Sequence, residues 1–324
     1  MAMDAKTGTA RANGRRAIII DTDPGYDDSV AILLALAARD RLDVCAITAV
    51  AGNVRLALTE RNARAMVELA GVRDVPVHAG CERPWIRPLW TAERICGASG
   101  IDGANLPEPT LPRAKAHAVD AIIDILERAP ERSVTLCPLG PLTNIATAFV
   151  RAPALVGRVR EIVLMGGALG IGNVTASAEF NIYVDPHAAA AVFAAGVPIV
   201  MFPLEATHQA IATPAWVGEM AGLGSRVGAV IAGMLGRDSG RDLTRFGGRG
   251  VPLHDPCVIG YLLWPELFTS YSAHVEIETG SELSIGRTVV DRWRAERKPD
   301  NAWVIERVAA DPFFARMTET LRRL

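Results

Sequence analysis

Short apolar runs alternate with helical patterns through the first two thirds of this 324-residue chain. The first run, AIII at 17–20, ends at the turn formers of DTDPG, and the helical run VAILLALAA follows. Further apolar runs occur at 42–50, 75–78, 134–136, 162–165 and 197–202, in alternation with turns and helical patterns. Wholly apolar strands are buried on both faces, and strands that alternate with helices form parallel sheets. The pattern predicts an α/β fold with a mostly parallel, Rossmann-like open central sheet flanked by helices. We expect one large domain at 16–324 behind a flexible N-terminal tail at 1–15.

Composition narrows the kind of protein further. Half of the residues are apolar and 22% are charged, which supports a full hydrophobic core. The formal net charge of −2 argues against nucleic acid or an anionic membrane as a partner, because proteins that bind either of them carry an excess of basic residues. The five cysteines form no CxxC pair, and no run of about 18 apolar residues occurs. We therefore expect a cytoplasmic protein.

The sequence DTDPGYDD at 21–28 places four carboxylates within eight residues, directly after the first expected strand. In an open parallel sheet, ligands bind in the crevice beyond the carboxyl ends of the strands. One aspartate could cap the following helix, but four exceed what capping requires. Crowded carboxylates repel one another, and a hard divalent cation removes that cost. The residues alone favour such a site and leave calcium and magnesium both open.

Further residues lie at or beyond the ends of other expected strands. They are Asn53, Leu139, Met165, Asn173, Glu179 and Asn181. Each of them alone is typical of an ordinary turn. Beside the acidic cluster, their amides and carboxylate fit a ligand with several hydroxyl groups, because amides and carboxylates can recognise neighbouring hydroxyls.

His254 and Asp255 stand before the apolar run CVIGYLLW. Asp255 fits either a helix N-cap or a distant carboxylate that completes the ligand shell of the cation. His254 fits a proton donor beside it. The other histidines have no metal-ligand spacing and are interpreted as structural: His78, His117, His187, His208 and His274.

Six motifs in combination resemble the inosine–uridine preferring nucleoside hydrolases. They are DTDPGYDD at 21–28, AGN at 51–53, CPLGPLTN at 137–144, LMGG at 164–167, GNVTASAEFN at 172–181 and HDP at 254–256. The resemblance runs from about residue 18 to the C-terminus. It implies an α/β fold, bound Ca²⁺, hydrolysis of the N-glycosidic bond of ribonucleosides to free ribose and nucleobase, and a homodimer or homotetramer.

The resemblance also assigns roles to the matching residues. Asp23, Asp28 and Asp255 would ligate calcium together with the main-chain carbonyl of Leu139. Asp23 would also act as general base on the attacking water, in a reaction with an oxocarbenium-like transition state. Asp27 would hold the ribose 2′-hydroxyl, and His254 would contact and protonate the leaving base. The remaining ribose-binding positions are matched by Asn53, Met165, Asn173, Glu179 and Asn181.

One expected substrate-binding position departs from the better-known pattern. Cys96 stands where many members of the family have histidine and purine-specific members have tryptophan, although a subset carries cysteine. His254 in place of tryptophan argues mildly against purine-specific stacking, and the base preference stays open. Cys96 lies in the aperiodic stretch 80–112, which is typical of a functional or mobile loop. Trp85 and Trp90 of that loop fit either base stacking or packing as loop anchors.

Two other functions remain open at the level of the residues. A phosphatase of the haloacid-dehalogenase type also begins with an apolar strand and a DxD pattern, but it needs a downstream lysine. Lys115 is the only mid-chain lysine and does not follow a strand, so we give this function little weight. A nucleoside- or sugar-binding protein without turnover is the second alternative.

Overall fold

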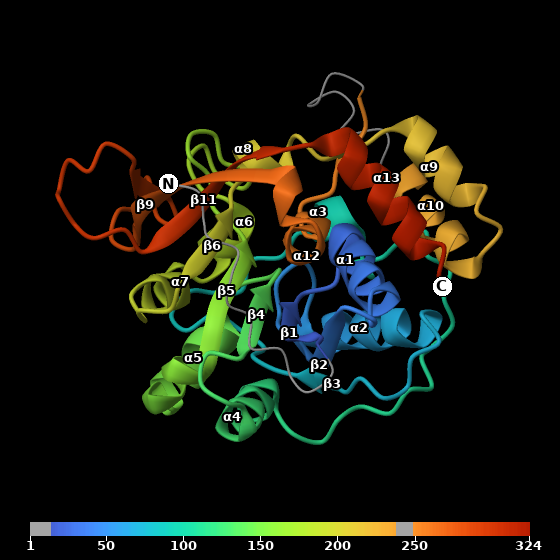
Figure 1. Cartoon of the computed structure of the whole chain (residues 1–324), viewed down its shortest axis with the longest axis horizontal. Helices are drawn as coiled ribbons and strands as arrows, with labels where there is room; N and C mark the ends of the chain where they lie inside the picture. The colour runs from blue at the N-terminus through green and yellow to red at the C-terminus, as the bar shows by residue number, and fades with distance from the viewer. Residues whose placement is uncertain (1–13, 238–248) are drawn as a thin grey trace.

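The computed structural model describes residues 14–237 and 249–324 and contains one large sheet of nine strands, with helices packed on both of its faces (Figure 1). The predicted tail at 1–15 lies almost wholly outside the described residues, so its boundary stays a prediction. The strands along the sheet are in the order β10-β9-β11-β6-β5-β4-β1-β2-β3. The predicted α/β class with a mostly parallel sheet is confirmed.

Parallel pairing joins seven of these strands. They are β1 (Arg16–Thr22), β2 (Leu42–Ala49), β3 (Val77–Ala79), β4 (Val134–Pro138), β5 (Val159–Met165), β6 (Ile199–Phe202) and β11 (Ala302–Val308). The apolar sequence of β1 follows from its central place, because Ile18, Ile19 and Ile20 are fully buried between the two helical layers. The other two strands, β9 (Phe268–Ile277) and β10 (Thr288–Asp291), are antiparallel and form one edge of the sheet.

The direction of strand addition reverses at β1. The chain adds β2 and β3 on one side of β1 and then returns to add β4, β5 and β6 on the other. A reversal of this kind opens a crevice at the carboxyl ends of the two strands that flank it, here β1 and β4. The acidic segment after β1 and the turn after β4 are therefore brought to the same place.

Two layers of helices cover the sheet. One hydrophobic cluster joins the sheet to α1 (Tyr26–Ala37), α2 (Leu56–Leu69), α9 (Pro214–Ala221), α10 (Arg226–Arg237), α12 (Pro256–Leu263) and α13 (Ala310–Leu321). A second cluster joins the other face to α4 (Ala118–Arg128), α5 (Thr143–Arg151) and α7 (Pro186–Phe193). The two groups lie on opposite sides of the strands in Figure 1. No helix in 14–237 or 249–324 is long and apolar enough to cross a membrane.

Short elements complete the edge where the strands carry their carboxyl ends. They are α3 (Glu93–Cys96), α6 (Phe180–Val184), α8 (Leu204–Thr207) and the two-stranded sheet of β7 (Ile211–Ala212) and β8 (Val251–Pro252). The 3-10 helices η1 (Pro153–Arg158) and η3 (Pro265–Leu267) precede β5 and β9.

Candidate active site

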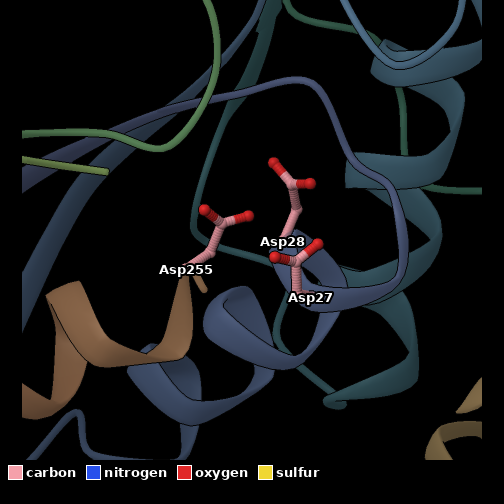
Figure 2. A group of neighbouring side chains, drawn as sticks. All are labelled: Asp27, Asp28 and Asp255. Carbon is pink, nitrogen blue, oxygen red and sulfur yellow. The ribbon is translucent and has the colours of Figure 1, made fainter. Parts of the chain in front are cut away.

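The acidic cluster is assembled from two helix N-termini. Asp27 and Asp28 lie in the first turn of α1, and Asp255 directly precedes α12. Carboxylate oxygens of these three residues all lie within 4.8 Å of one another. Figure 2 shows the three side chains turned toward a common space. Asp255 makes no side-chain capping bond to α12, so its carboxylate is not used as an N-cap.

Burial dominates the electrostatics of this cluster. It raises the pKa of Asp27, and it raises the pKa of Asp28 to about 6 with a further contribution from the charge of Asp27. Burial, followed by repulsion from Asp27, Asp28 and Asp23, raises the pKa of Asp255 well above its ordinary value. Several negative charges in one buried place are costly without a cation, so the three carboxylates form a possible cation-binding group.

Asp28 is held by four donors. Its Oδ1 accepts from the Thr22 hydroxyl at 2.5 Å and from the Asp23 amide at 3.2 Å. Its Oδ2 accepts from the Gly25 amide at 3.0 Å and from Nδ2 of Asn53 at 3.2 Å. Gly25 is the N-cap residue of α1, and its amide donates to Asp28 in the first turn, so Asp28 both caps its helix and faces the cluster.

Asp23 lies behind the cluster, fully buried between two glycines. A Cβ atom at Gly52 or at Gly140 would overlap its carboxylate, so neither position has room for a side chain. Oδ2 of Asp23 accepts from the Asn53 amide at 2.6 Å, whereas the buried Oδ1 has no hydrogen-bond partner. Burial and the nearby charge of Asp28 raise the pKa of Asp23 well above its ordinary value.

A cavity of about 250 Å³ opens in front of this cluster at the carboxyl edge of the sheet. Ten of the twelve site residues expected from the sequence line it. They are Asp27, Asn53, Cys96, Leu139, Met165, Asn173, Glu179, Asn181, His254 and Asp255. Asp23 and Asp28 do not line the cavity, and the tightest carboxylate group contains Asp27 rather than Asp23.

Glu179 and Asn181 fix the far wall of the cavity. Glu179 caps α6 and accepts from the amides of Asn181, Gly167 and Ile182 at 2.9, 3.0 and 3.3 Å. Nδ2 of Asn181 donates to the carbonyls of Leu139 at 2.6 Å and Met165 at 3.1 Å, which ties the ends of β4 and β5 together. Burial raises the pKa of Glu179 to about 7.

Asn173 and Cys96 occupy two other parts of the cavity wall. The buried Oδ1 of Asn173 has no hydrogen-bond partner, and the residue lines the cavity. Sγ of Cys96 lies 3.5 Å from Oδ1 of Asn53, so this thiol contacts the asparagine that bridges Asp23 and Asp28.

His254 stands at another end of the cavity. Its main-chain amide donates to Oδ2 of Asp27 at 3.3 Å, and its Nδ1 lies 2.6 Å from the Thr207 hydroxyl. Burial lowers the pKa of His254 to about 4, so the imidazole is neutral at pH 7. A neutral imidazole can still donate one hydrogen bond from a ring nitrogen.

Among the lining residues that the sequence interpretation missed is His208, which was expected to be structural. It lines the cavity, and its ring centroid lies 5.5 Å from that of His254. Position was the available signal, because His208 follows β6 and α8 just as the other site residues follow their strands.

The two tryptophans of the loop 80–112 have different surroundings. Nε1 of Trp85 donates to Thr147 at 2.9 Å, and its amide donates to Asp185 at 3.0 Å, as expected of a loop anchor. Trp90 lines the cavity and packs edge to face on Tyr183, with ring centroids 6.0 Å apart.

A cavity at the reversal point of an open parallel sheet, walled by carboxylates, amides and two histidines, defines an α/β enzyme for a small polar ligand. The profile of the inosine-uridine preferring nucleoside hydrolase family matches residues 18–315, and the chain belongs to this family. It is therefore an enzyme, a nucleoside hydrolase that acts on ribonucleosides. This identification sets aside both the phosphatase and the binding-protein alternatives.

Similar proteins cover nearly the whole chain. An uncharacterized protein of Schizosaccharomyces pombe is 44% identical over 95% of this chain and 99% of its own length. The pyrimidine-specific ribonucleoside hydrolase RihA of Photobacterium profundum is 42% identical over 94% and 98%. Among solved structures, the purine-preferring ribonucleoside hydrolase from Gardnerella vaginalis matches with a TM-score of 0.88 and 29% identity, covering 95% of this chain and 98% of that one.

Proposed function

We propose that this enzyme hydrolyses the N-glycosidic bond of ribonucleosides in a calcium-dependent reaction, with Asp23 as the general base. The observation that carries this proposal is the buried Oδ1 of Asp23, which has no hydrogen-bond partner and lies beside three further aspartates. A carboxylate that is held at one oxygen and has no hydrogen-bond partner at the other is suited to take a proton from water.

The donor set fits a hard divalent cation. Asp23, Asp28, Asp255 and the carbonyl of Leu139 would hold it, and all of them offer oxygen atoms. The Leu139 carbonyl already accepts one bond from Asn181 and keeps a second lone pair. When bound, the cation supplies positive charge that orients the ribose diol and makes a nearby water easier to deprotonate.

Residues on two sides of the cavity would bind and orient the ribose. Asp27 and Asn53 would hold the ribose 2′- and 3′-hydroxyls on the acidic side of the cavity. The opposite side of the sugar would be fixed by Met165, Asn173, Glu179 and Asn181. A sugar held on both sides is presented to water in one orientation, which lowers the entropic part of the barrier. The anomeric carbon gains oxocarbenium character as the base departs.

His254 is placed to assist the leaving base. It lines the same cavity as the ribose-binding residues and is neutral at pH 7. Its contribution is therefore a hydrogen bond from the ring to the departing base, rather than a charge already present on the imidazole. Cys96 would act at the acidic side through Asn53 and contribute little to the choice of base.

Pyrimidine ribonucleosides are the proposed preferred substrates. The relatives named pyrimidine-specific ribonucleoside hydrolases reach 42% identity over nearly their whole length, whereas the purine-preferring structure reaches 29%. His254 in the place of a stacking tryptophan agrees with this preference. We further propose a cytoplasmic homodimer or homotetramer that acts in nucleoside catabolism and base salvage, with no nucleic-acid or membrane partner.

Ribose release from a substrate panel tests the proposal. Purified enzyme is incubated with uridine, cytidine, inosine, adenosine and guanosine, and free ribose is measured against time. The proposal predicts that the enzyme releases free ribose from ribonucleosides and that kcat/KM is highest for uridine and cytidine. Equal or higher kcat/KM for the purine ribonucleosides would refute the pyrimidine preference, and no release from any of the five would refute the activity.

A further inference from the structure

Thr207 is a fully buried threonine that has no role in the mechanism described so far. Its hydroxyl lies 2.6 Å from Nδ1 of His254. The same hydroxyl is 3.4 Å from the carbonyl of Pro203 and 3.4 Å from the carbonyl of Leu204. The contact with the imidazole is therefore the shortest by a wide margin, and it joins a buried side chain to a residue that lines the cavity.

Three neighbouring elements fix this contact. Thr207 ends α8, whose first residue Leu204 donates its amide to the Gly167 carbonyl at 2.9 Å, just beyond β5. Leu253 donates its amide to the Ala210 carbonyl at 2.8 Å, beside the ladder of β7 and β8. This bond brings the segment of His254 back against the end of α8. Asp27 then holds the His254 amide from the other side at 3.3 Å.

The contact lengths around the Thr207 hydroxyl favour one position for the ring proton. The hydroxyl has one proton to donate, and three acceptors compete for it: Nδ1 at 2.6 Å and the two carbonyls at 3.4 Å. The strongest bond forms at the shortest contact, which makes Nδ1 the acceptor. The proton of the ring then lies on Nε2. Nε2 has no hydrogen-bond partner within the described part of the chain, and His254 lines the cavity.

We propose that Thr207 is a positioning residue, which holds the His254 ring in one orientation and one tautomer so that Nε2–H donates to the leaving base. The ring of His208 packs against the same imidazole, with a 61° angle between the ring planes, and limits its rotation. No proton leaves the ring in this role, because the bond to the base is a hydrogen bond. The inference rests on the proposed function, since it assigns the base to the His254 end of the cavity.

A pair of variants separates positioning from simple packing. Thr207→Val keeps the shape of the side chain and removes the hydroxyl, whereas Thr207→Ser keeps the hydroxyl. Thr59→Val is the matched control. Thr59 is also fully buried and bonds through its hydroxyl to two main-chain carbonyls, at 2.9 and 3.1 Å, but it does not line the cavity.

The variants are compared on uridine and on p-nitrophenyl riboside, whose leaving group departs without help. We expect Thr207→Val to lower kcat/KM for uridine about tenfold relative to that for p-nitrophenyl riboside, mainly through kcat. Thr207→Ser should restore most of this ratio, and Thr59→Val should leave it unchanged. Equal losses on both substrates, no loss on either, or a failure of serine to restore the ratio would overturn the inference.

Imidazole ¹⁵N chemical shifts give a readout that needs no turnover. The chain contains six histidines, and the signals of His254 in ¹⁵N-histidine-labelled protein are assigned with a His254→Gln variant. The proposal predicts protonated Nε2 and bare Nδ1 in the wild-type enzyme. Protonated Nδ1 would overturn it, even if Thr207→Val did not fold. If the wild-type enzyme released ribose from no nucleoside, the proposed function would be refuted. The ¹⁵N chemical shifts would still decide which tautomer His254 adopts.

Discussion

Asp23 differs from Asp28 in how its carboxylate oxygens are satisfied. Asp28 is held at both oxygens, whereas Asp23 is held at Oδ2 only and keeps a buried, unpartnered Oδ1. A buried oxygen without a hydrogen-bond partner lowers the free energy of unfolding, and native proteins keep such atoms where the atom has a functional role. This asymmetry is the reason for assigning the base to Asp23 rather than to Asp28.

Replacing Asp23 by asparagine tests that assignment. Asp23→Asn keeps the bond from the Asn53 amide but removes the proton acceptor. We expect kcat for uridine to fall by about 10²–10⁴-fold, the usual contribution of a general base. Asp43→Asn is the control, because Asp43 lies near the amino end of β2, away from the cavity. Near-normal ribose release by a folded Asp23→Asn enzyme would contradict the role.

The glycines beside Asp23 lead to a second prediction at the same scale. Because a Cβ at position 52 would overlap the Asp23 carboxylate, Gly52→Ala should displace it. We expect a loss of about 1–3 kcal/mol in the free energy of unfolding, as for other overpacked sites, together with a fall in kcat. Gly218→Ala is the control, since its added methyl group meets nothing within 4 Å. Denaturant unfolding and ribose release measure both effects, and unchanged activity in Gly52→Ala would show that the carboxylate is free to move.

At the scale of elements, the site lies where the carboxyl ends of several strands and the N-termini of two helices come together. Asp23 follows β1, Leu139 follows β4, and Met165 ends β5. Asp27 and Asp28 begin α1, and Asp255 begins α12, so the positive ends of two helix dipoles face the acidic cluster. These dipoles offset part of the repulsion between the carboxylates, but a bound cation is needed to offset more of it.

Most of this arrangement could be predicted from the sequence, because buried parallel strands and long helices have strong periodic signals. The apolar run at 17–20 and the helix after DTDPG are both found where they were expected. The short elements α3, α6, α8, β7 and β8 were not predicted, because two to five residues carry no period. His208 follows the expected strand at 197–202, which was a positional signal for the cavity. The contact of Thr207 with His254 depends on the short helix α8 and could not be foreseen from local pattern alone.

The loop at 80–112 gives an element-scale prediction. Trp85 anchors the loop to Thr147 and Asp185, whereas Trp90 lines the cavity. We expect Trp85→Ala to lower the melting temperature more than Trp90→Ala does. Trp90→Ala should mainly raise KM, by about 2–10-fold, as for the loss of one aromatic contact. Thermal melting and steady-state kinetics of the two variants check this, and the reverse pattern would exchange the two roles.

At the scale of the whole molecule, the buried carboxylates link stability to pH. Burial raises the pKa of Asp28 from 3.8 to about 6 and also raises the pKa values of Asp23, Asp27 and Asp255. The folded protein therefore holds protons that the unfolded chain releases. The stability that these groups contribute is present at low pH and is lost as the pH rises through the folded pKa values.

Calcium should reverse that loss, because it binds the deprotonated carboxylates. We predict that the increase in melting temperature on adding calcium grows between about pH 5 and pH 7.5. Asp255→Asn should reduce the increase at every pH, and Asp43→Asn should not. A calcium-induced shift that is independent of pH, or one that survives in Asp255→Asn, would contradict the assignment of these carboxylates to the cation.

The central claim is cation-dependent N-glycosidic hydrolysis, and the most direct measurement is ribose release from uridine by one enzyme preparation in three states. The enzyme is assayed as purified, after removal of divalent cations with a chelator, and after calcium is returned. The account predicts activity, loss of activity and recovery, with magnesium restoring less than calcium. Full ribose release by the chelated enzyme, shown by elemental analysis to hold no divalent cation, would contradict it.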